Sequence, residues 1–172
     1  TITGNPSMYT FDNQNSNGGG QDNDWQAVTN TKAIDLVAGE AYRIFIRGDR
    51  NYDLDSNPAD PPNSDVTLRP TGSLALGDQS YDLNPNQDEY SLVGNPYQAI
   101  VDMNTVMSNT NTTNVNTNYY WVWDPNMSPG GAQGAYVAID LSTGNSQTPG
   151  GSPSSSAANQ FVMPGQSFFV QT

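Results

Sequence analysis

Tyr90-Ser91-Leu92-Val93-Gly94-Asn95-Pro96-Tyr97 is the stretch that decides the fold of this chain. Its apolar centre, Leu92 and Val93, predicts a short strand. Gly94 follows, where the backbone can take a positive φ angle, and the Asn95-Pro96 pair ends the strand. Before this stretch the chain reads as short strands separated by turns. After it come one helical segment and the most aromatic strand of the protein.

Short alternating or apolar runs bounded by turn residues recur along the whole chain. They predict strands at 8–12, 25–28, 33–37, 41–48, 66–69, 73–76, 79–83, 89–93, 119–126, 134–140, 161–163 and 167–171. Two hairpins are expected, one between 79–83 and 89–93 and one between 119–126 and 134–140. The segments 13–24, 51–64, 108–118 and 143–159 are polar and predict loops.

Apolar residues at Val101, Met103, Val106 and Met107 predict one short helix, with Asp102 near its start where the helix dipole favours an acidic side chain. Many short strands and a single helix together predict an all-β fold, a jelly-roll-like antiparallel β-sandwich with one short helix near 99–107. The 172 residues are expected to form one such module, 1–172, cut from a larger multi-domain secreted protein.

Charge excludes several partners. The chain has 17 acidic and 5 basic residues, no histidine and a net charge of −12. Such a surface repels phosphates, so we expect no nucleic acid partner, and the lack of a long apolar run predicts no membrane insertion. Cysteine is absent, which excludes disulfides and thiolate metal sites.

Several motifs, taken in order and spacing, resemble a module of large secreted proteins of Bacteroidetes, especially flavobacteria, which leave the cell through the type IX secretion system. The motifs span roughly residues 8 to 172 and comprise Arg47–Arg50, Thr67–Arg69, Ser91–Tyr97, Tyr120–Asn126, Gly134–Tyr136 and Pro164–Val170. The chain departs from the pattern at Gln98, where such proteins often carry another proline. The resemblance implies a secreted or cell-surface location, in an adhesin or a polysaccharide-associated protein.

Catalysis is not expected. Without histidine or cysteine, the Ser-His-Asp and Cys-His arrangements cannot form. Glu40 and Glu89 are the only glutamates, and both lie in predicted turns, where burial would not raise the pKa of a catalytic acid. We therefore predict that the chain is not an enzyme.

Calcium is the one cofactor that the sequence suggests. Acidic and amide side chains crowd one loop: Asp49, Asp53, Asp55, Asn57, Asp60 and Asp65. Oxygen ligands at alternate positions suit this ion, although Pro58 and Ser64 stand where an EF-hand needs glycine and glutamate. The alternative is a polar loop of Asx turns. A second acidic group, Asp12, Asp22 and Asp24, is a weaker candidate.

Aromatic residues supply the second candidate site. Tyr119, Trp121 and Trp123 alternate along one strand and must share a face, opposite Tyr120 and Val122. Exposed, they would form a stacking platform for sugars, supplemented by Trp25 and Tyr97. Buried, they would fill the core. The expected function is thus a non-catalytic structural or adhesive module that contacts neighbouring domains of the same polypeptide, with binding of an extracellular polysaccharide or surface glycan, calcium-assisted, as the alternative.

Overall fold

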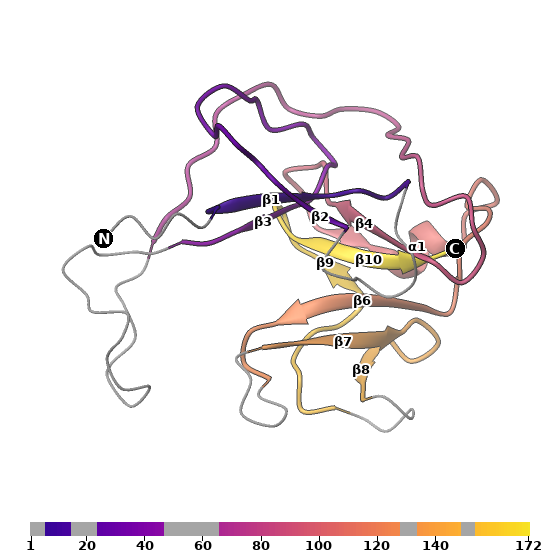
Figure 1. Cartoon of the computed structure of the whole chain (residues 1–172). Coiled ribbons are helices and arrows are strands. Elements are labelled where there is room, and N and C mark those ends of the chain that lie inside the picture. The colour runs from indigo at the N-terminus through magenta and orange to yellow at the C-terminus, as the bar shows by residue number, and fades with distance from the viewer. Residues whose placement is uncertain (1–5, 15–23, 47–65, 128–133, 149–153) are drawn as a thin grey trace.

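The computed structural model describes residues 6–14, 24–46, 66–127, 134–148 and 154–172 (Figure 1). The elements in chain order are β1 Met8–Phe11, β2 Trp25–Ala27, β3 Tyr42–Ile44, β4 Tyr90–Gly94, β5 Val101–Asp102, α1 Met103–Met107, β6 Tyr119–Asp124, β7 Ala135–Asp140, β8 Asn145–Gln147, β9 Phe161–Val162 and β10 Ser167–Gln171. The predicted all-β, sandwich-like fold with one short helix is confirmed.

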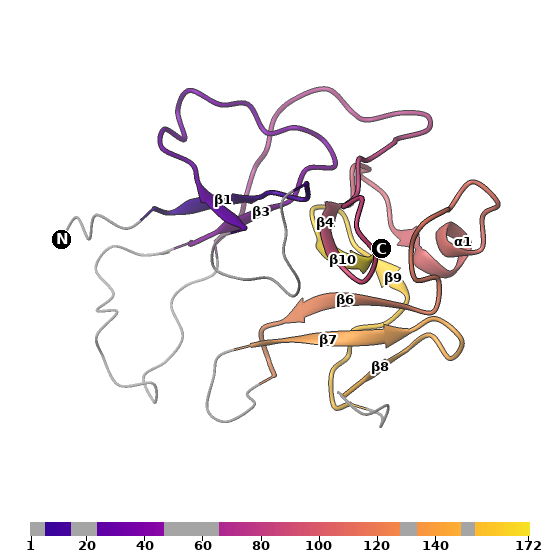
Figure 2. The same cartoon turned by 45° about the vertical axis from the view of Figure 1, so that its right-hand side comes forward.

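Every pairing between the described strands is antiparallel. A five-stranded sheet has the order β4-β10-β6-β7-β8, a three-stranded sheet the order β2-β1-β3, and β5 pairs with β9 in a two-stranded ribbon. Figure 2 shows the three-stranded sheet on one side of β4 and β10, and α1 on the other. The five-stranded sheet therefore contributes both of its faces to packing.

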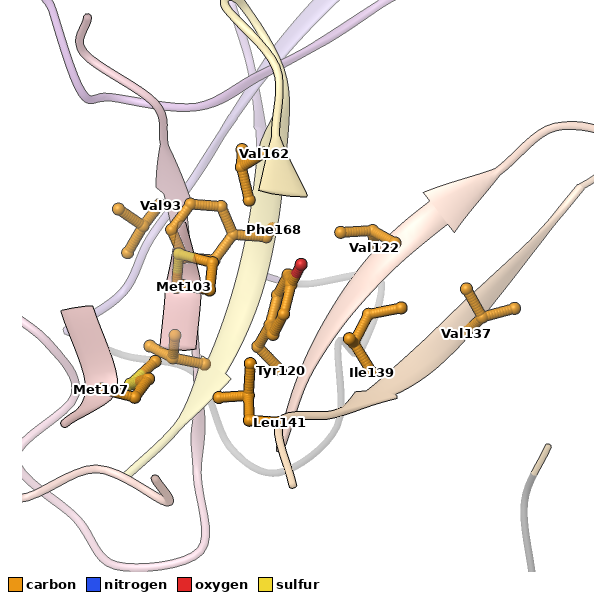
Figure 3. Packing of buried hydrophobic residues seen from close by; sticks show 11 residues of the cluster. Val93, Met103, Met107, Tyr120, Val122, Val137, Ile139, Leu141, Val162 and Phe168 are labelled. Carbon is orange, nitrogen blue, oxygen red and sulfur yellow. The ribbon is translucent and has the colours of Figure 1, made fainter. Parts of the chain in front are cut away.

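The main core lies between one face of the five-stranded sheet and the layer that contains α1 and β9 (Figure 3). Tyr120 and Ile139, from paired positions of β6 and β7, are fully buried there. Met103 of α1 and Val162 of β9 close the core from the opposite side. Burying such large apolar side chains is the principal stabilising contribution to the sheet.

A smaller core lies on the opposite face of the same sheet. Leu92 of β4 and Phe169 of β10 pack there against Ala41, which precedes β3. Phe11 of β1 and Trp25 of β2 add partly buried rings, so the three-stranded sheet is the second layer of the sandwich. It covers the β4–β10 end of the five-stranded sheet.

Gly94 ends β4, as predicted, but for a different reason. Its φ is not among the positive φ angles of the described glycines, so the expected left-handed conformation is wrong. Instead its N–H donates to the carbonyl oxygen of Gly39 at 2.8 Å. A Cβ atom at Gly94 would lie 2.9 Å from the carbonyl oxygen of Glu40. The glycine is needed because two backbone segments approach each other closely.

Asparagine and aspartate side chains fold many of the turns. In each case the side-chain oxygen accepts a hydrogen bond from the backbone N–H two residues on, which is the geometry of an Asx turn. These acceptors are Asp12, Asn30, Asn84, Asn95, Asp102, Asn109, Asn116, Asp124, Asp140 and Asn159. The composition thus reflects a fold of short strands joined by self-stabilised turns.

Four predicted strands are wrong. Residues 33–37, 66–69, 73–76 and 79–83 form no strand, and the hairpin expected between 79–83 and 89–93 is replaced by pairing of β4 with β10. Most of the large apolar side chains of the first three segments are exposed, among them Leu36 at 55%, Leu68 at 60% and Leu76 at 79%. The backbone of these segments pairs with no strand of the described ranges, and these side chains are not buried in a core.

Three element bounds also need correction. The helix begins at Met103 instead of near 99, because Val101 and Asp102 pair with β9 and the Asp102 side chain caps the helix by accepting from the Asn104 N–H at 3.0 Å. The described part of the long strand expected at 41–48 is a strand only over β3. The segment 143–159, predicted as a loop, contains β8.

Candidate functional site

The predicted alternation of β6 is confirmed. Trp121 stands opposite Phe169 of β10 and Ala138 of β7, and Trp123 stands opposite Tyr136 of β7. Residues paired directly across an antiparallel ladder share a face, so these side chains all point away from the main core.

The rings on this face contact one another from β7 to β2. The centroids of Trp123 and Tyr136 are 5.1 Å apart, those of Tyr136 and Phe169 5.2 Å, and those of Phe169 and Phe11 5.1 Å. Trp25 continues the series at 5.1 Å from Phe11. All these pairs are edge-to-face, the arrangement in which the positive edge of one ring meets the negative face of the next.

A side branch joins Trp121 to the same series. Tyr90 of β4 lies 5.0 Å from Trp121 and 6.4 Å from Phe169, measured between ring centroids. We call the whole group the aromatic face. Its members are Phe11, Trp25, Tyr90, Trp121, Trp123, Tyr136 and Phe169.

Exposure divides the aromatic face in two. Trp123 is 46% exposed and Tyr136 is 43% exposed, whereas Phe169 is buried. Trp121 and Trp25 are half-buried. The sequence left core and surface open for this strand, and the structure gives both outcomes: the Phe169 end is core, and the Trp123 end is surface.

Gly134 sets the position of the Trp123 indole. A Cβ atom at Gly134 would lie 2.2 Å from the indole ring, and the φ angle of Gly134 is +85°, in the left-handed region. Only glycine adopts this conformation without strain while leaving room for the ring. Trp123 is therefore held between the backbone at Gly134 and the edge contact with Tyr136.

Arg43 of β3 adds a positive charge to this face. Its guanidinium carbon lies 5.6 Å from the centroid of the Trp25 ring, within cation–π range. Burial raises the pKa of the Tyr136 hydroxyl, and the positive charge of Arg43 offsets this in part. The charge of Arg43 therefore acts on Trp25 and on Tyr136, the neighbour of Trp123 in the aromatic series.

Two other predicted aromatic residues have different surroundings. Tyr119 is half-buried on the same strand face as Trp121 but stands opposite Asp140, at the far end of β6. The Tyr97 hydroxyl donates to the carbonyl oxygen of Gly77 at 2.7 Å, and its N–H donates to Asn95 Oδ1 at 3.0 Å. Tyr97 is thus held by hydrogen bonds to Gly77 and Asn95.

Tyr136 and Arg43 were not among the predicted site residues. Tyr136 carried a usable signal, since the predicted hairpin of 119–126 with 134–140 places it opposite Trp123 or a near neighbour. No sequence signal pointed to Arg43, because its contact with Trp25 depends on the pairing of both β2 and β3 with β1.

The predicted calcium ligands Asp49, Asp53, Asp55, Asn57, Asp60 and Asp65 all lie outside the described residues. Of the second acidic group, Asp12 and Asp24 are described. Asp12 accepts hydrogen bonds from the Gln14 N–H and the Gln26 amide, and one buried oxygen of Asp24, Oδ2, has no hydrogen-bond partner. Within the described ranges, no group of three acidic, histidine or cysteine side chains is placed to hold a metal.

Two further aspartates serve the fold. The Ser156 hydroxyl and the Asn126 N–H donate to Asp124, and these bonds lower the pKa of its carboxyl. The pKa of Asp140 is lowered chiefly by the Ser142 hydroxyl, which donates at 2.6 Å. Both carboxylates are ionised hydrogen-bond acceptors within turns.

A cleft of about 520 Å³ lies between β1, the 37–41 segment and the 80–82 segment. Asp12, Glu40 and Asp82 line it, together with Tyr81. Glu40 accepts a hydrogen bond from the Tyr42 hydroxyl at 2.8 Å. The cleft is therefore acidic, in contrast to the Arg43 end of the aromatic face.

Comparisons with protein-family models, with curated proteins and with solved structures found no match for this chain. In the part of the chain that the structure describes, no helix has the length and apolar character of a membrane-spanning segment. Fold and site together define an all-β module with an aromatic surface between two sheets.

Proposed function

We propose that this chain is a non-catalytic adhesive module of a secreted or surface-attached bacterial protein, and that it binds carbohydrate through the aromatic face. The observation that carries the proposal is the exposure of two adjacent rings, Trp123 at 46% and Tyr136 at 43%. Contiguous exposed aromatic surface is typical of binding sites.

Sugar binding suits these rings chemically. One side of a pyranose ring presents C–H groups, which the negative face of an indole or phenol ring attracts. The Trp123 side chain is already held by Gly134 and Tyr136, so ordering it on binding costs little conformational entropy. The Tyr136 hydroxyl adds a donor and acceptor for sugar hydroxyl groups.

The secreted location rests on the composition and on the motif resemblance. A strongly acidic surface without cysteine, rich in Asn, Thr, Ser and Gly, is typical of exported bacterial β proteins. Its resemblance to modules of the type IX secretion system supports the same location.

A glycan array, run with and without calcium, tests the proposal. We expect retention of at least one glycan class by the native chain and its loss in Trp123→Ala and Tyr136→Ala. Phe161→Ala is the matched control, because Phe161 is an aromatic residue 45% exposed on β9, away from this face. If the array retains no glycan, the proposal is wrong. It is also wrong if glycan retention falls equally in all three variants.

Calcium assistance is a separate part of the proposal, and its ligands would be the aspartates of the 49–65 segment. A bound ion stabilises the folded state by mass action. The melting temperature should then rise between chelator and millimolar calcium. An unchanged melting temperature would exclude calcium binding, and the proposal that the aromatic face binds carbohydrate would still stand.

A purely structural role is the second candidate, favoured by another observation. Exposed apolar side chains gather in two segments before β4, at Ile34, Leu36, Val37, Ile44, Phe45, Ile46, Val66, Leu68, Leu74 and Leu76. Such a set suits a protein partner, and we propose neighbouring domains of the same polypeptide. Hydroxyl-radical footprinting of the chain alone and within its parent protein would detect their protection; equal labelling in both would exclude this role.

A further inference from the structure

Arg43 points toward the aromatic face because of the register of the three-stranded sheet. It stands opposite Tyr9 of β1, two residues from Phe11. Side chains two residues apart on a strand share a face, so Arg43 and Phe11 project from the same side of the sheet. Phe11 contacts Phe169 of the five-stranded sheet, so this side is the one that faces the aromatic rings.

The Arg43 guanidinium lies over the Trp25 ring at cation–π distance. No aspartate or glutamate of the described ranges forms an ion pair with it, in a chain with 17 acidic residues. The guanidinium carries five N–H donors, and its central carbon lies 5.6 Å from the centroid of the Trp25 ring, so the group can donate to a bound anion while it keeps this contact. Arg43 is exposed, so an anion from solution can reach these donors.

We propose that the aromatic face selects acidic polysaccharides, and that Arg43 binds the carboxylate or sulfate of the sugar while the rings take its apolar side. This inference rests on the carbohydrate binding proposed above and names its ligand class. A planar guanidinium with paired donors matches a carboxylate or sulfate in a bidentate geometry, which a neutral sugar cannot use.

The net charge of −12 opposes this ligand at long range, and the distances decide which effect prevails. At 0.15 M salt, charges separated by more than about 8 Å are largely screened. Contact between Arg43 and an anionic group is far shorter, so it keeps most of its strength. Binding should therefore persist at physiological salt, where the general repulsion is weak.

Pectin provides matched ligands. Polygalacturonate and its fully methyl-esterified form share the same sugar units and stacking surfaces, and only the first carries carboxylates. Dextran sulfate and dextran form a second such pair, with sulfate as the anion. Affinities of the native chain for the four polymers would be measured by isothermal titration calorimetry at 0.15 M salt, with chelator present to exclude calcium bridging.

Variants separate charge from packing. Arg43→Gln removes the charge, and we expect about a tenfold loss of affinity for the acidic member of the preferred pair, with little change for its neutral counterpart. Arg43→Lys keeps the positive charge but loses the paired N–H donors of the guanidinium. Its affinity for the acidic polymer should therefore lie between those of the native chain and Arg43→Gln. Arg69→Gln is the matched control, since Arg69 is an exposed arginine in the 66–78 segment. Unchanged melting temperatures would show that all variants fold.

Each result has a defined meaning. Preference for the acidic polymers that falls in Arg43→Gln and survives in Arg69→Gln supports the inference. Equal or stronger binding of the neutral polymers overturns it and leaves carbohydrate binding intact. Equal losses in both glutamine variants also overturn it, because they reflect overall charge alone. Binding of no polymer in this panel or on the glycan array defeats the inference together with the proposed function.

Discussion

The Asn13 side chain bonds both backbone groups of Leu92. Its Nδ2 donates to the Leu92 carbonyl oxygen at 3.0 Å, and its Oδ1 accepts from the Leu92 N–H at 2.7 Å. β4 is an edge strand of the five-stranded sheet, so its outer side presents backbone N–H and carbonyl groups that no strand of that sheet pairs with. At Leu92, the Asn13 side chain makes the two hydrogen bonds that a neighbouring strand would make. One side chain from beyond β1 thereby joins the three-stranded sheet to the main sheet.

Asn13→Ala should destabilise the fold by about 1–3 kcal/mol, because it leaves a partly buried N–H and carbonyl of Leu92 without partners. Denaturant unfolding measures this change. Asn30→Ala is the control: Asn30 makes an exposed turn bond to the Lys32 N–H, and its loss should cost much less. Equal costs would show that Asn13 contributes no more than an ordinary Asx turn.

Gly94 and Gly72 make a matched pair for substitution by alanine. A Cβ at Gly94 would meet backbone oxygens at 2.9 Å and 3.2 Å, whereas at Gly72 nothing lies within 4 Å. We expect Gly94→Ala to cost about 1–3 kcal/mol through forced backbone movement. Gly72→Ala should be neutral or stabilise by about 0.4–1 kcal/mol, because it restricts the unfolded chain.

Thermal unfolding of both variants distinguishes these effects. A tolerated Gly94→Ala would contradict the close approach of β4 to the 39–40 segment. Destabilisation by Gly72→Ala would contradict the open space around that position.

The alternation of apolar and polar residues predicted strands that do form, and also several segments that pair with no other described strand. β6 and β10 combine alternation with aromatic and β-branched residues, and both lie inside the five-stranded sheet. The run at 73–76 has a similar apolar content, yet Leu74 is 65% exposed. Strand formation depends on long-range pairing, which a local pattern does not encode. The polar strand β8 was missed because edge strands need no apolar residues.

The candidate site was predictable only as a set of residues. The spacing of Trp121 and Trp123 fixed their common face, but Tyr120 and Val122 make the opposite face equally apolar. Which side became core depended on where α1 and β9 pack, through Met103 and Val162. Exposure of Trp123 depends further on how far the three-stranded sheet extends over β6. Neither fact follows from local sequence.

Asp140 should contribute to stability at neutral pH and not in acid. Hydrogen bonds from Ser142 and Gln147 lower the pKa of its carboxyl in the folded state. A lowered folded pKa gives stability that is present above the unfolded pKa of about 3.9 and is lost as pH falls through the folded value. Asp140→Asn should therefore cost about 1–2 kcal/mol at pH 7, and progressively less below pH 4.

Melting temperatures of the native chain and Asp140→Asn between about pH 2 and pH 7 measure that difference. Asp78→Asn serves as the control, because Asp78 is exposed and its replacement should cost little stability. A cost of Asp140→Asn that stays constant into acid would show that the carboxylate charge is not what these bonds recognise.

Trp123 should be the most accessible of the three tryptophans to a neutral fluorescence quencher. It is 46% exposed, whereas Trp25 and Trp121 are half-buried. Replacement of Trp123 by phenylalanine should remove the largest quenchable fraction seen with acrylamide, and Trp121→Phe should remove little. Gly134→Ala places a Cβ within 2.2 Å of the indole and should displace it, so that quenching of Trp123 rises and its emission shifts to the red. Unchanged quenching in Gly134→Ala would mean that Tyr136 alone positions the ring, and the site would then depend on the β7 contact and not on the turn before it.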